Sequence, residues 1–380
     1  MQKKQKIAIV YDWIDKWGGV ERVLLTLHEM FPQAEFFTTY YDSEKAAWAK
    51  NLKINSSFMQ KLPVFIRRNR IASFPFYPYV FESFDFTGYD LVISVTSSFA
   101  KSVITKPGTL HICYLLTPTR YLWVYPEIYF QNKLIRSLLS SCLAKLRKWD
   151  FIAAQRPDKI ISISKTVGDR CKKYYKRESE VVYPPIDVEY WHKIKSEIRK
   201  SKFETNPKFE NLNSKQKYFL TVSRLEPYKK VELLTQLFNQ LSQDLVIVGE
   251  GREEHKLKRT ANKNIIFLKN LTDQELGILY SNAEALIMPQ EEDFGYVSLE
   301  AQFFGCPVIA YGKGGARETI IEGKTGIFFN EQSVKSLKSA LIKFNMVKYE
   351  LKHKTEEFGQ KNVVRFSRNK FEKSFESLCE

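Results

Sequence analysis

Long apolar runs and paired cysteines are both missing from this 380-residue sequence. No uninterrupted apolar stretch approaches the ~18 residues that a membrane-spanning helix needs. The cysteines form no Cys-x-x-Cys pair and have no histidine partner at zinc-binding spacing, which argues against disulfides and a structural metal site. They are odd in number and scattered, as is typical of a reducing compartment: Cys113, Cys142, Cys171, Cys306 and Cys379.

Signatures of nucleic-acid binding are also missing. The formal net charge of +16 would attract nucleic acid, anionic lipid or phosphorylated small molecules. No RNP, zinc-finger or helix-turn-helix pattern accompanies the charge, so we expect no nucleic-acid partner. The amino-terminal IAIV run is too short for the core of a signal peptide and is soon followed by Asp12. We therefore expect a cytoplasmic protein without a cleaved leader.

Short β-branched runs alternate with helical stretches along the whole chain. Apolar strands separated by helices predict parallel sheets covered on both faces. A single core rarely grows beyond ~250–300 residues, so two series of runs predict two doubly wound α/β domains. The first series is KIAIVYDW, AEFFTTYY, DLVISVTSS, HICYLLT, KIISIS and EVVYPP, and the second is YFLTVSRL, DLVIVGEG, NIIFLKN, ALIMP, PVIAYG and GIFF.

Two segments mark the domain organisation. Residues 190–217 are charged and poor in apolar residues, which predicts a linker or surface excursion, and we place the domain boundary at residue 187. Near the end of the chain, Phe366, Phe371 and Phe375 recur at helical spacing. This pattern predicts a terminal helix that packs on one of the domains.

Glycine-rich turns and a pair of basic residues follow the expected strands. WGGVERVL, VGEGREEHKL and YGKGGARETI each lead into a helix whose first amides suit phosphate, although glycine could merely permit the turn. Arg224 and Lys229 lie five residues apart across a proline-containing turn. A planar guanidinium and a point charge can clamp a diphosphate, and the alternative is a solvated helix start.

Taken in order, these motifs resemble a known enzyme family. SRLEPYKK, VGEG and PQEEDFGYVSLEAQFFGCPVIAYGKGGARETI are similar to glycosyltransferase family 4, whose Glu-x7-Glu spacing is met by Glu292 and Glu300. YDWIDKWGGVERVL, TPTRYLW, LRKWDFIAAQRPDKIISIS and VVYPPID resemble its branch of bacterial O-antigen mannosyltransferases. The resemblance implies the GT-B fold, with two Rossmann-like domains facing a central cleft. It implies an acceptor-binding domain at 1–187, a nucleotide-sugar-binding domain at 188–360 and a C-terminal helix at 361–380.

The resemblance also implies roles for single residues. Glu292 would face the donor sugar, and Glu300 would accept hydrogen bonds from the ribose hydroxyls. Arg224 and Lys229 would neutralise the departing nucleoside diphosphate and form the catalytic set with Glu292. Further implied residues are backbone groups near the nucleotide sugar, at Gly18, Gly19, Gly249, Gly295, Tyr296 and Val297, and a pocket for the acceptor or the donor sugar at Leu116, Thr117 and Arg120.

The implied reaction is hexose transfer with retention of anomeric configuration. The donor would be a GDP- or UDP-linked sugar, with mannose first, and the acceptor a glycan or lipid-linked glycan in cell-surface polysaccharide synthesis, such as lipopolysaccharide O-antigen. The sequence has no Asp-x-Asp motif, so we expect no metal and no other cofactor. A sugar-nucleotide epimerase of the same fold and a non-catalytic nucleotide-sugar-binding subunit stay open as alternatives.

One residue departs from the family pattern. Leu116 stands where the related enzymes carry His in Cys-His-Thr-Pro. His111 lies five residues upstream on an expected strand, so its side chain would project to the opposite face and cannot replace that His. Because leucine cannot hydrogen-bond a sugar 6-hydroxyl, a 6-deoxyhexose donor is a second hypothesis.

Two basic segments point to a membrane. FIRRNRIASFPFYPYVFESF, at 65–84, mixes arginine with many aromatic residues, and LIRSLLSSCLAKLRKW, at 134–149, alternates apolar and basic residues. Both could rest on an anionic membrane that holds a lipid-linked acceptor, although the second could be an ordinary buried face with a basic rim. We expect a peripheral location on the inner face of the cytoplasmic membrane.

Overall fold

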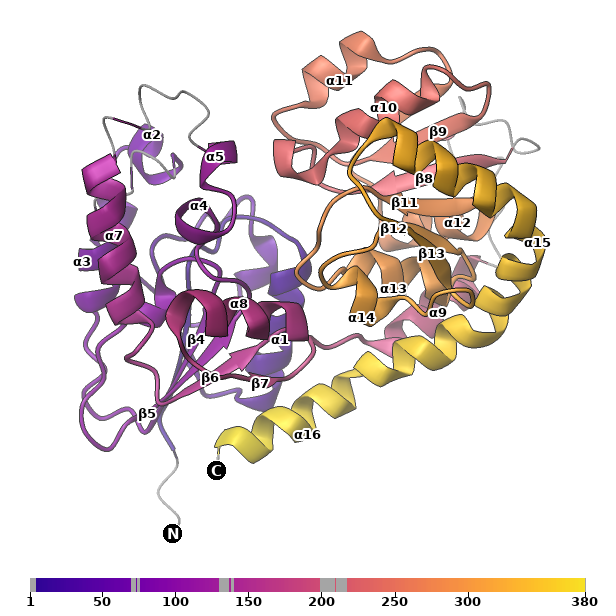
Figure 1. Cartoon of the computed structure of the whole chain (residues 1–380). Coiled ribbons are helices and arrows are strands. Elements are labelled where there is room, and N and C mark those ends of the chain that lie inside the picture. Colours follow the sequence, from indigo (N-terminus) through magenta and orange to yellow (C-terminus); the bar gives the residue numbers. More distant parts are fainter. Residues whose placement is uncertain are drawn as a thin grey trace. The chain divides into compact units, whose positions relative to one another are not determined.

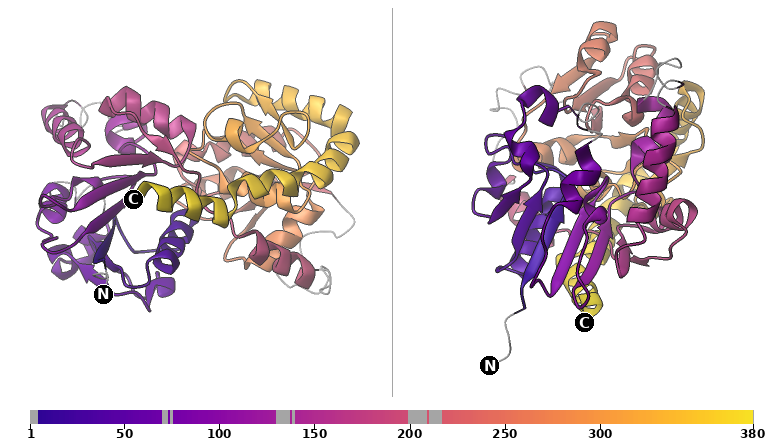
Figure 2. Two further views of the ribbon diagram at one scale, coloured as in Figure 1. Left: turned by 90° about the horizontal axis from the view of Figure 1, so that it is seen from below. Right: turned by 90° about the vertical axis from the view of Figure 1, so that its left-hand side faces the viewer.

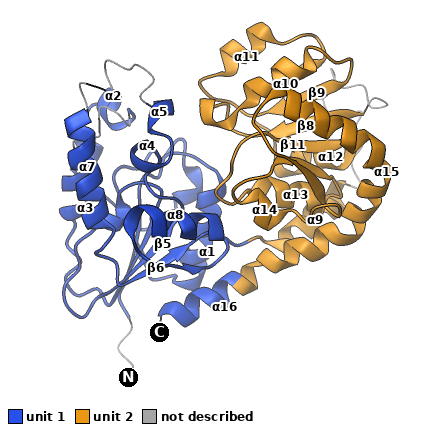
Figure 3. Cartoon of the chain, in the orientation of Figure 1, with its two compact units in different colours: residues 1–185, 371–380 blue, residues 186–370 orange. Residues whose placement is uncertain are grey.

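The computed structural model describes residues 5–69, 73, 76–129, 137, 140–198, 209 and 217–379. The chain divides into two compact units, residues 1–185 with 371–380 and residues 186–370, which Figure 3 distinguishes by colour. The predicted boundary at residue 187 lies two residues after this division. Each unit is built around one parallel sheet.

Among the described residues, the sheet of the first unit has seven strands in the order β3-β2-β1-β4-β5-β6-β7. Its strands are β1 (Ile7–Tyr11), β2 (Glu35–Thr38), β3 (Ile54–Ser56), β4 (Leu91–Thr96), β5 (Leu110–Leu115), β6 (Lys159–Ser162) and β7 (Glu180–Val181). Every pairing is parallel, with Ile9 opposite Ile93 in the centre. The predicted strands are confirmed, and only the short edge strand β3 was not expected.

The strand order of the first unit reverses between β1 and β4. Right-handed crossovers therefore put α1 (Gly19–Met30) and α7 (Ser140–Ala153) on opposite faces of the sheet. Figures 1 and 2 show helices on both sides of these strands. The other helices of this unit are η1 (Ala47–Ala49), η2 (Phe58–Lys61), α2 (Val64–Arg67), α3 (Tyr77–Glu82), η4 (Ala100–Ser102), α4 (Arg120–Trp123), α5 (Pro126–Tyr129) and α8 (Lys165–Tyr175).

In the described part of the second unit, the sheet has six parallel strands in the order β10-β9-β8-β11-β12-β13. They are β8 (Tyr218–Val222), β9 (Asp244–Val248), β10 (Ile265–Leu268), β11 (Ala285–Met288), β12 (Val308–Tyr311) and β13 (Gly326–Phe329). All six predicted strands are confirmed. The order reverses between β8 and β11, so this second unit is also doubly wound.

Helices cover both faces of this second sheet as well. They are α9 (Val188–Ile198), η7 (Pro227–Lys229), α10 (Val231–Phe238), α11 (Glu254–Thr260), α12 (Asp273–Asn282), α13 (Tyr296–Phe303), α14 (Ala316–Thr319), α15 (Val334–Val363) and η8 (Val364–Phe366). Apolar side chains of α10 and α15, including Leu234, Phe238 and Phe344, pack on Phe219 and Ile247 of the sheet in one buried cluster.

The linker prediction is wrong where it meets α9. Trp191 and Ile194 of this helix are buried in the second unit, and the Trp191 ring centroid lies 5.7 Å from that of Phe304. The sequence hid this helix because only these two apolar positions are buried among charged neighbours. Residues 199–208 and 210–216 of the expected linker lie outside the described residues.

The predicted terminal helix is present as α16 (Arg368–Cys379). Phe371 and Phe375 pack against Tyr114 of the first unit, at ring distances of 5.8 and 6.0 Å. Phe366 does not share this face, because it lies in η8 and packs 5.4 Å from Phe294. Within the described residues, no helix combines the length and apolar character needed to cross a membrane.

Candidate functional site

The reversal of strand order marks where a doubly wound sheet binds its ligand. At such a switch point, the segments that follow the two central strands diverge and leave a crevice at their carboxyl ends. In the second unit these strands are β8 and β11. The segments that follow them, 223–229 and 289–295, contain Arg224, Lys229, Glu292 and Gly295. The fold thus brings these predicted residues to one edge of one sheet.

Lys229 and Glu292 form an ion pair that the sequence analysis did not foresee. Lys229 Nζ lies 2.5 Å from Glu292 Oε1, and the two side chains are only 11% and 15% exposed. The Nε2 of Gln290 donates to the same Glu292 oxygen at 2.6 Å. Burial raises the pKa of Glu292 most strongly, but the Lys229 charge and the hydrogen bonds from Lys229 and Gln290 together hold that pKa below its ordinary value. Glu292 is therefore an ionised, oriented carboxylate.

Gln290 was not singled out from the sequence, although it follows β11 directly. Its amide nitrogen must face Glu292, because the amide oxygen would be repelled by the carboxylate. Its Oε1 is buried and has no hydrogen-bond donor among the described residues. A buried acceptor of this kind is uncommon in proteins and is a feature to expect near a binding site.

Arg224 and Lys229 meet through Tyr228 and differ in exposure. The Arg224 guanidinium donates to Tyr228 Oη at 2.6 Å and is exposed, whereas Lys229 is buried. The Lys229 ammonium lies 5.6 Å from the centroid of the Tyr228 ring. The left-handed conformation of Lys230 (φ 55°) separates η7 from α10 and turns Lys229 toward β11. One cation is thus held by the fold, and the other lies at the surface.

Glu300 occupies a separate position on α13. This helix begins after Gly295, whose φ of 98° favours glycine, so Gly295, Tyr296 and Val297 form its amino-terminal turn. Glu300 is buried, and its Oε2 accepts a hydrogen bond of 3.1 Å from Tyr280 Oη. The Phe-Gly turn therefore gives Glu292 and Glu300 different partners.

At two turns, close packing within the protein explains why the residue is glycine. A Cβ on Gly249, whose φ is 139°, would lie 1.9 Å from the carbonyl oxygen of Ser223. A Cβ on Gly315 would lie 2.4 Å from the Phe294 carbonyl, and the Gly315 amide donates to Glu292 O at 2.7 Å. These glycines allow close packing against the segments that carry Arg224 and Glu292, so for them the turn-forming interpretation is sufficient. A contact of Gly249 with nucleotide stays a prediction.

In the first unit, Gly18 and Gly19 begin helix α1 as the sequence predicts. The buried carboxylate of Glu21 lies next to this turn. A Cβ on Gly18 would lie 3.1 Å from Glu21 Oε2. Burial raises the pKa of Glu21 most strongly. The expected approach of Gly18 and Gly19 to phosphate stays a prediction.

The residues after β5 are buried at the carboxyl edge of the first sheet. Leu116 and Thr117 are 6% and 1% exposed, and Thr117 Oγ1 has no hydrogen-bond partner among the described residues. Arg120 begins helix α4. His111 lies inside the core with Nε2 2.9 Å from Ser94 Oγ, and burial lowers its pKa to about 3. His111 therefore does not substitute for the histidine that Leu116 replaces.

Asp12 was missed by the sequence analysis, although it directly follows β1. Its carboxylate accepts hydrogen bonds from the amides of Ser97, Phe99 and Ala100 and from the Thr96 hydroxyl, at 2.7–2.9 Å. It fixes the turn that follows β4 at the switch point of the first sheet. Within the described ranges, no three His, Cys, Asp or Glu side chains gather as metal ligands would.

The comparisons with known proteins concern both the sequence and the fold. A family model described as glycosyl transferases group 1 matches residues 202–362. This segment, which is less than half of the chain, is similar to the group 1 glycosyltransferases. The matched segment contains β8 to β13 and every predicted site residue of the second unit.

Several curated mannosyltransferases are similar to part of the chain. Alpha-1,3/1,6-mannosyltransferase ALG2 of Homo sapiens is 30% identical over 202 residues, 44% of this chain and 46% of that protein. The GDP-mannose-dependent alpha-(1-6)-phosphatidylinositol monomannoside mannosyltransferase of Mycolicibacterium smegmatis is 30% identical over 138 residues, 32% of this chain and 36% of that protein. The chain thus spans less than half the length of these curated relatives.

Solved structures resemble the chain over almost its whole length. Sucrose-phosphate synthase from Thermosynechococcus elongatus has a TM-score of 0.74 at 17% identity, and the match covers 99% of this chain and 98% of that one. HepE of Anabaena, in complex with UDP and glucose, has a TM-score of 0.71 at 16% identity, covering 98% and 99%. At these identities the likeness concerns the fold, and the prediction of a GT-B fold is confirmed.

Proposed function

We propose that this protein is a hexosyltransferase that moves a sugar from a nucleoside-diphosphate sugar onto a glycan or lipid-linked acceptor, with mannose as the first sugar to test. The proposal is supported by the match of residues 202–362 to the glycosyl transferases group 1 model and by the similarity to mannosyltransferases. Because one relative is named as GDP-mannose-dependent and HepE was solved with UDP, both bases belong in the first experiments.

The observation that carries the proposal is the trio of Lys229, Glu292 and Gln290 at the β8–β11 switch point. A buried ammonium that is 2.5 Å from an ionised carboxylate offers one group to a phosphate and the other to a sugar hydroxyl. Both groups are already oriented, so little reorganisation is needed when a ligand binds. An arrangement made only for stability would not need the unpartnered Gln290 oxygen.

In this proposal, different groups of the protein bind the ribose, the diphosphate and the sugar of the donor. Glu300 accepts hydrogen bonds from the ribose hydroxyls, and the amides of Gly295, Tyr296 and Val297 bind the diphosphate at the positive end of α13. Arg224 and Lys229 stabilise the charge that develops on the leaving phosphate, so no bound metal is required for that step. Glu292 binds the sugar hydroxyls.

The stereochemical course proposed is retention, by attack of the acceptor on the face from which the nucleoside diphosphate departs. The leaving phosphate takes the acceptor proton in this scheme, so no second carboxylate is needed as a base.

A non-catalytic nucleotide-sugar-binding subunit is the second candidate, because Leu116 replaces a histidine of the related enzymes. An epimerase would convert the nucleotide sugar into its epimer without needing an acceptor.

Peripheral membrane association is part of the proposal, with the product serving cell-surface polysaccharide such as lipopolysaccharide O-antigen. Phe65 and Tyr79 are 74% and 69% exposed in the predicted aromatic segment, and Val64, which directly precedes it, is also exposed. Arg67 and Arg68 are held by the Gln60 carbonyl and by Asp42, and Arg70 lies outside the described residues. The aromatic side chains therefore support membrane contact better than the arginines do. In the second predicted segment, Leu143 is buried in the core, and residues 134–136, 138 and 139 lie outside the described residues.

A thermal-shift screen tests the proposed substrate class. UDP, GDP and their hexose conjugates should raise the melting temperature, since a ligand that binds only the native state stabilises it by RT ln(1 + [L]/Kd). Transfer to an acceptor, assayed with the conjugates that bind, then separates the enzyme from a binding subunit. Binding with neither transfer nor slow release of nucleoside diphosphate would favour the non-catalytic subunit. A lack of any binding would reject both the enzyme and the subunit.

A further inference from the structure

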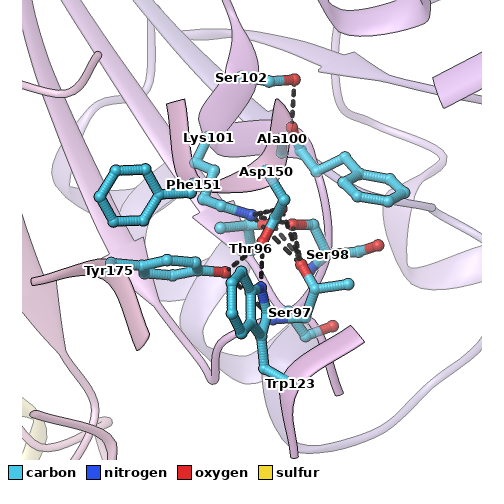
Figure 4. Close-up of polar contacts among 12 residues, drawn as sticks. Thr96, Ser97, Ser98, Ala100, Lys101, Ser102, Trp123, Asp150, Phe151 and Tyr175 are labelled. Carbon is cyan, nitrogen blue, oxygen red and sulfur yellow. Dashed lines mark hydrogen bonds and ion pairs between the residues drawn. The ribbon is translucent and has the colours of Figure 1, made fainter. Parts of the chain in front are cut away.

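Asp150 of helix α7 is a buried carboxylate with donors from several distant segments (Figure 4). Its side chain has no exposed area, and that of its ion-pair partner Lys101 is 1% exposed. Lys101 Nζ lies 2.6 Å from Oδ1, and the Thr119 hydroxyl lies 3.1 Å from the same oxygen. Oδ2 accepts hydrogen bonds from Trp123 Nε1 at 2.7 Å and Tyr175 Oη at 2.9 Å. Both carboxylate oxygens are therefore fully used.

Two of these donors lie at opposite ends of the short helix α4. Thr119 is its amino-terminal capping residue, and Trp123 is its last residue. Arg120 lies between them, and the amide of Thr119 also donates to Tyr175 Oη at 3.2 Å. One carboxylate thus binds the segment that follows β5 on both sides of Arg120.

Lys101 extends the connection to the end of β4. Its ammonium donates to the Ser98 carbonyl as well as to Asp150, and it lies 3.3 Å from the Thr119 hydroxyl. Ser98 belongs to the turn that Asp12 binds through Thr96 and the neighbouring amides. The segments after β4 and β5, at the carboxyl edge of the sheet, are therefore tied to one buried charge pair.

Stability alone does not account for this choice of residues. Two buried charges lose their hydration, and apolar residues of similar volume are often as good or better for stability. A carboxylate with four aimed donors does fix the geometry of the groups around it, since each hydrogen bond is strengthened by the charge and depends on direction.

We propose that Asp150, with Lys101, is a positioning residue that holds the turn 116–123 in the geometry needed for sugar transfer. The inference rests on the proposed function and on the pocket for the acceptor or the donor sugar that the family resemblance implies at Leu116, Thr117 and Arg120. Asp150 itself touches no substrate. It acts through Thr119 and Trp123, which hold Arg120 between them and follow Leu116 and Thr117 in the chain.

A charge-neutral double variant separates positioning from folding. Asp150→Asn and Lys101→Met each leave one buried charge unpaired, so each should lower the melting temperature by about 10 °C. Lys101→Met/Asp150→Val removes both charges and should regain part of that loss. It leaves no side-chain oxygen to accept from Trp123 and Tyr175, so the hold on α4 stays broken. Glu82→Gln is the matched control, because it weakens the Arg156 and Trp149 contacts of the same unit without touching the turn.

Hydrogen exchange and transfer kinetics give the decisive readouts. In the double variant, amides of residues 116–124 should exchange at least tenfold faster than in the parent protein, and kcat/KM for transfer should fall about 10–100-fold. The affinity for free nucleoside diphosphate, which binds the second unit, should stay within about threefold. Glu82→Gln should change neither the exchange of 116–124 nor the transfer. If the parent shows no transfer, the proposed function fails, while the exchange measurement still tests the hold on the turn. Parental exchange at 116–124, or parental transfer, in the double variant would overturn the inference.

Discussion

Lys229 Nζ lies 2.5 Å from Glu292 Oε1, although 63 positions separate the two residues in the sequence. The pair joins the segments that follow β8 and β11, the two central strands of the second sheet. The pair is mostly buried, and it keeps Glu292 ionised although burial by itself raises the pKa of that carboxyl. Stability, pH dependence and ligand binding should therefore all respond to this pair.

Acid should weaken the second unit through Glu292. The folded-state pKa of Glu292 lies below its ordinary value of 4.5, so the unfolded state binds more protons as the pH falls through this range. The stability contributed by the pair is therefore present above pH 4.5 and is lost as the pH falls through the folded pKa. Lys229→Met should cost about 3 kcal/mol at neutral pH, because it leaves a buried charge unpaired.

Urea unfolding at several pH values measures this dependence. The difference between the parent and Lys229→Met should be largest near neutral pH and should shrink toward acid. Lys258→Met is the control, because its Glu254 pair is a surface contact worth ~0.3–0.5 kcal/mol. A constant difference between parent and Lys229→Met across the acid range would show that the pair does not set the ionisation of Glu292.

Gly249→Ala should be far more damaging than a matched glycine substitution. The added Cβ would overlap the Ser223 carbonyl at 1.9 Å, so the segment before Arg224 must shift, at ~3 kcal/mol or more. Gly323 also has a positive φ, 73°, but a Cβ there would meet nothing within 4 Å. Gly323→Ala should therefore cost only ~1–2 kcal/mol. Equal losses in chemical denaturation would refute the steric explanation.

Phe65→Ser/Tyr79→Ser should reduce sedimentation with vesicles that contain phosphatidylglycerol. Both side chains are largely exposed, and their burial in a lipid surface would contribute ~1.5–3 kcal/mol each. The control is Ile104→Ser/Ile152→Ser, which removes exposed apolar side chains elsewhere on the first unit. Should both pairs of substitutions reduce vesicle binding equally, or neither reduce it, the aromatic segment is not the membrane contact.

Leu116→His should shift donor choice toward sugars that have a 6-hydroxyl. Leucine leaves such a hydroxyl without a partner, and an unmade buried hydrogen bond costs ~1–3 kcal/mol. The ratio of hexose to 6-deoxyhexose transfer should therefore rise by about tenfold or more in the variant. Leu110→His, at the other end of β5, should leave the ratio unchanged. An unchanged ratio in Leu116→His would remove Leu116 from the sugar pocket and with it the hypothesis of a 6-deoxyhexose donor.

The sequence predicted the strands well, because each is a short apolar run with its own turn. Helix α9 and the separate packing of Phe366 were missed, since both depend on contacts with residues far along the chain. The same limit applies to the site. Arg224, Lys229 and Glu292 could be recognised by motif, whereas the Lys229–Glu292 pair, the Gln290 amide and the Asp150 donors depend on tertiary placement that no local pattern encodes.

Release of nucleoside diphosphate from GDP-mannose and UDP-glucose, in the presence of excess EDTA, tests the central claim most directly. With an acceptor glycan present, the parent protein should turn over at least one of these donors. Lys229→Ala and Glu292→Gln should each lower kcat by about 100-fold or more, the size of a lost preorganised charge contact. Lys258→Ala should retain the parental rate. Turnover that disappears with EDTA and returns with Mg²⁺ or Mn²⁺, or that is unchanged in Lys229→Ala, would contradict the account.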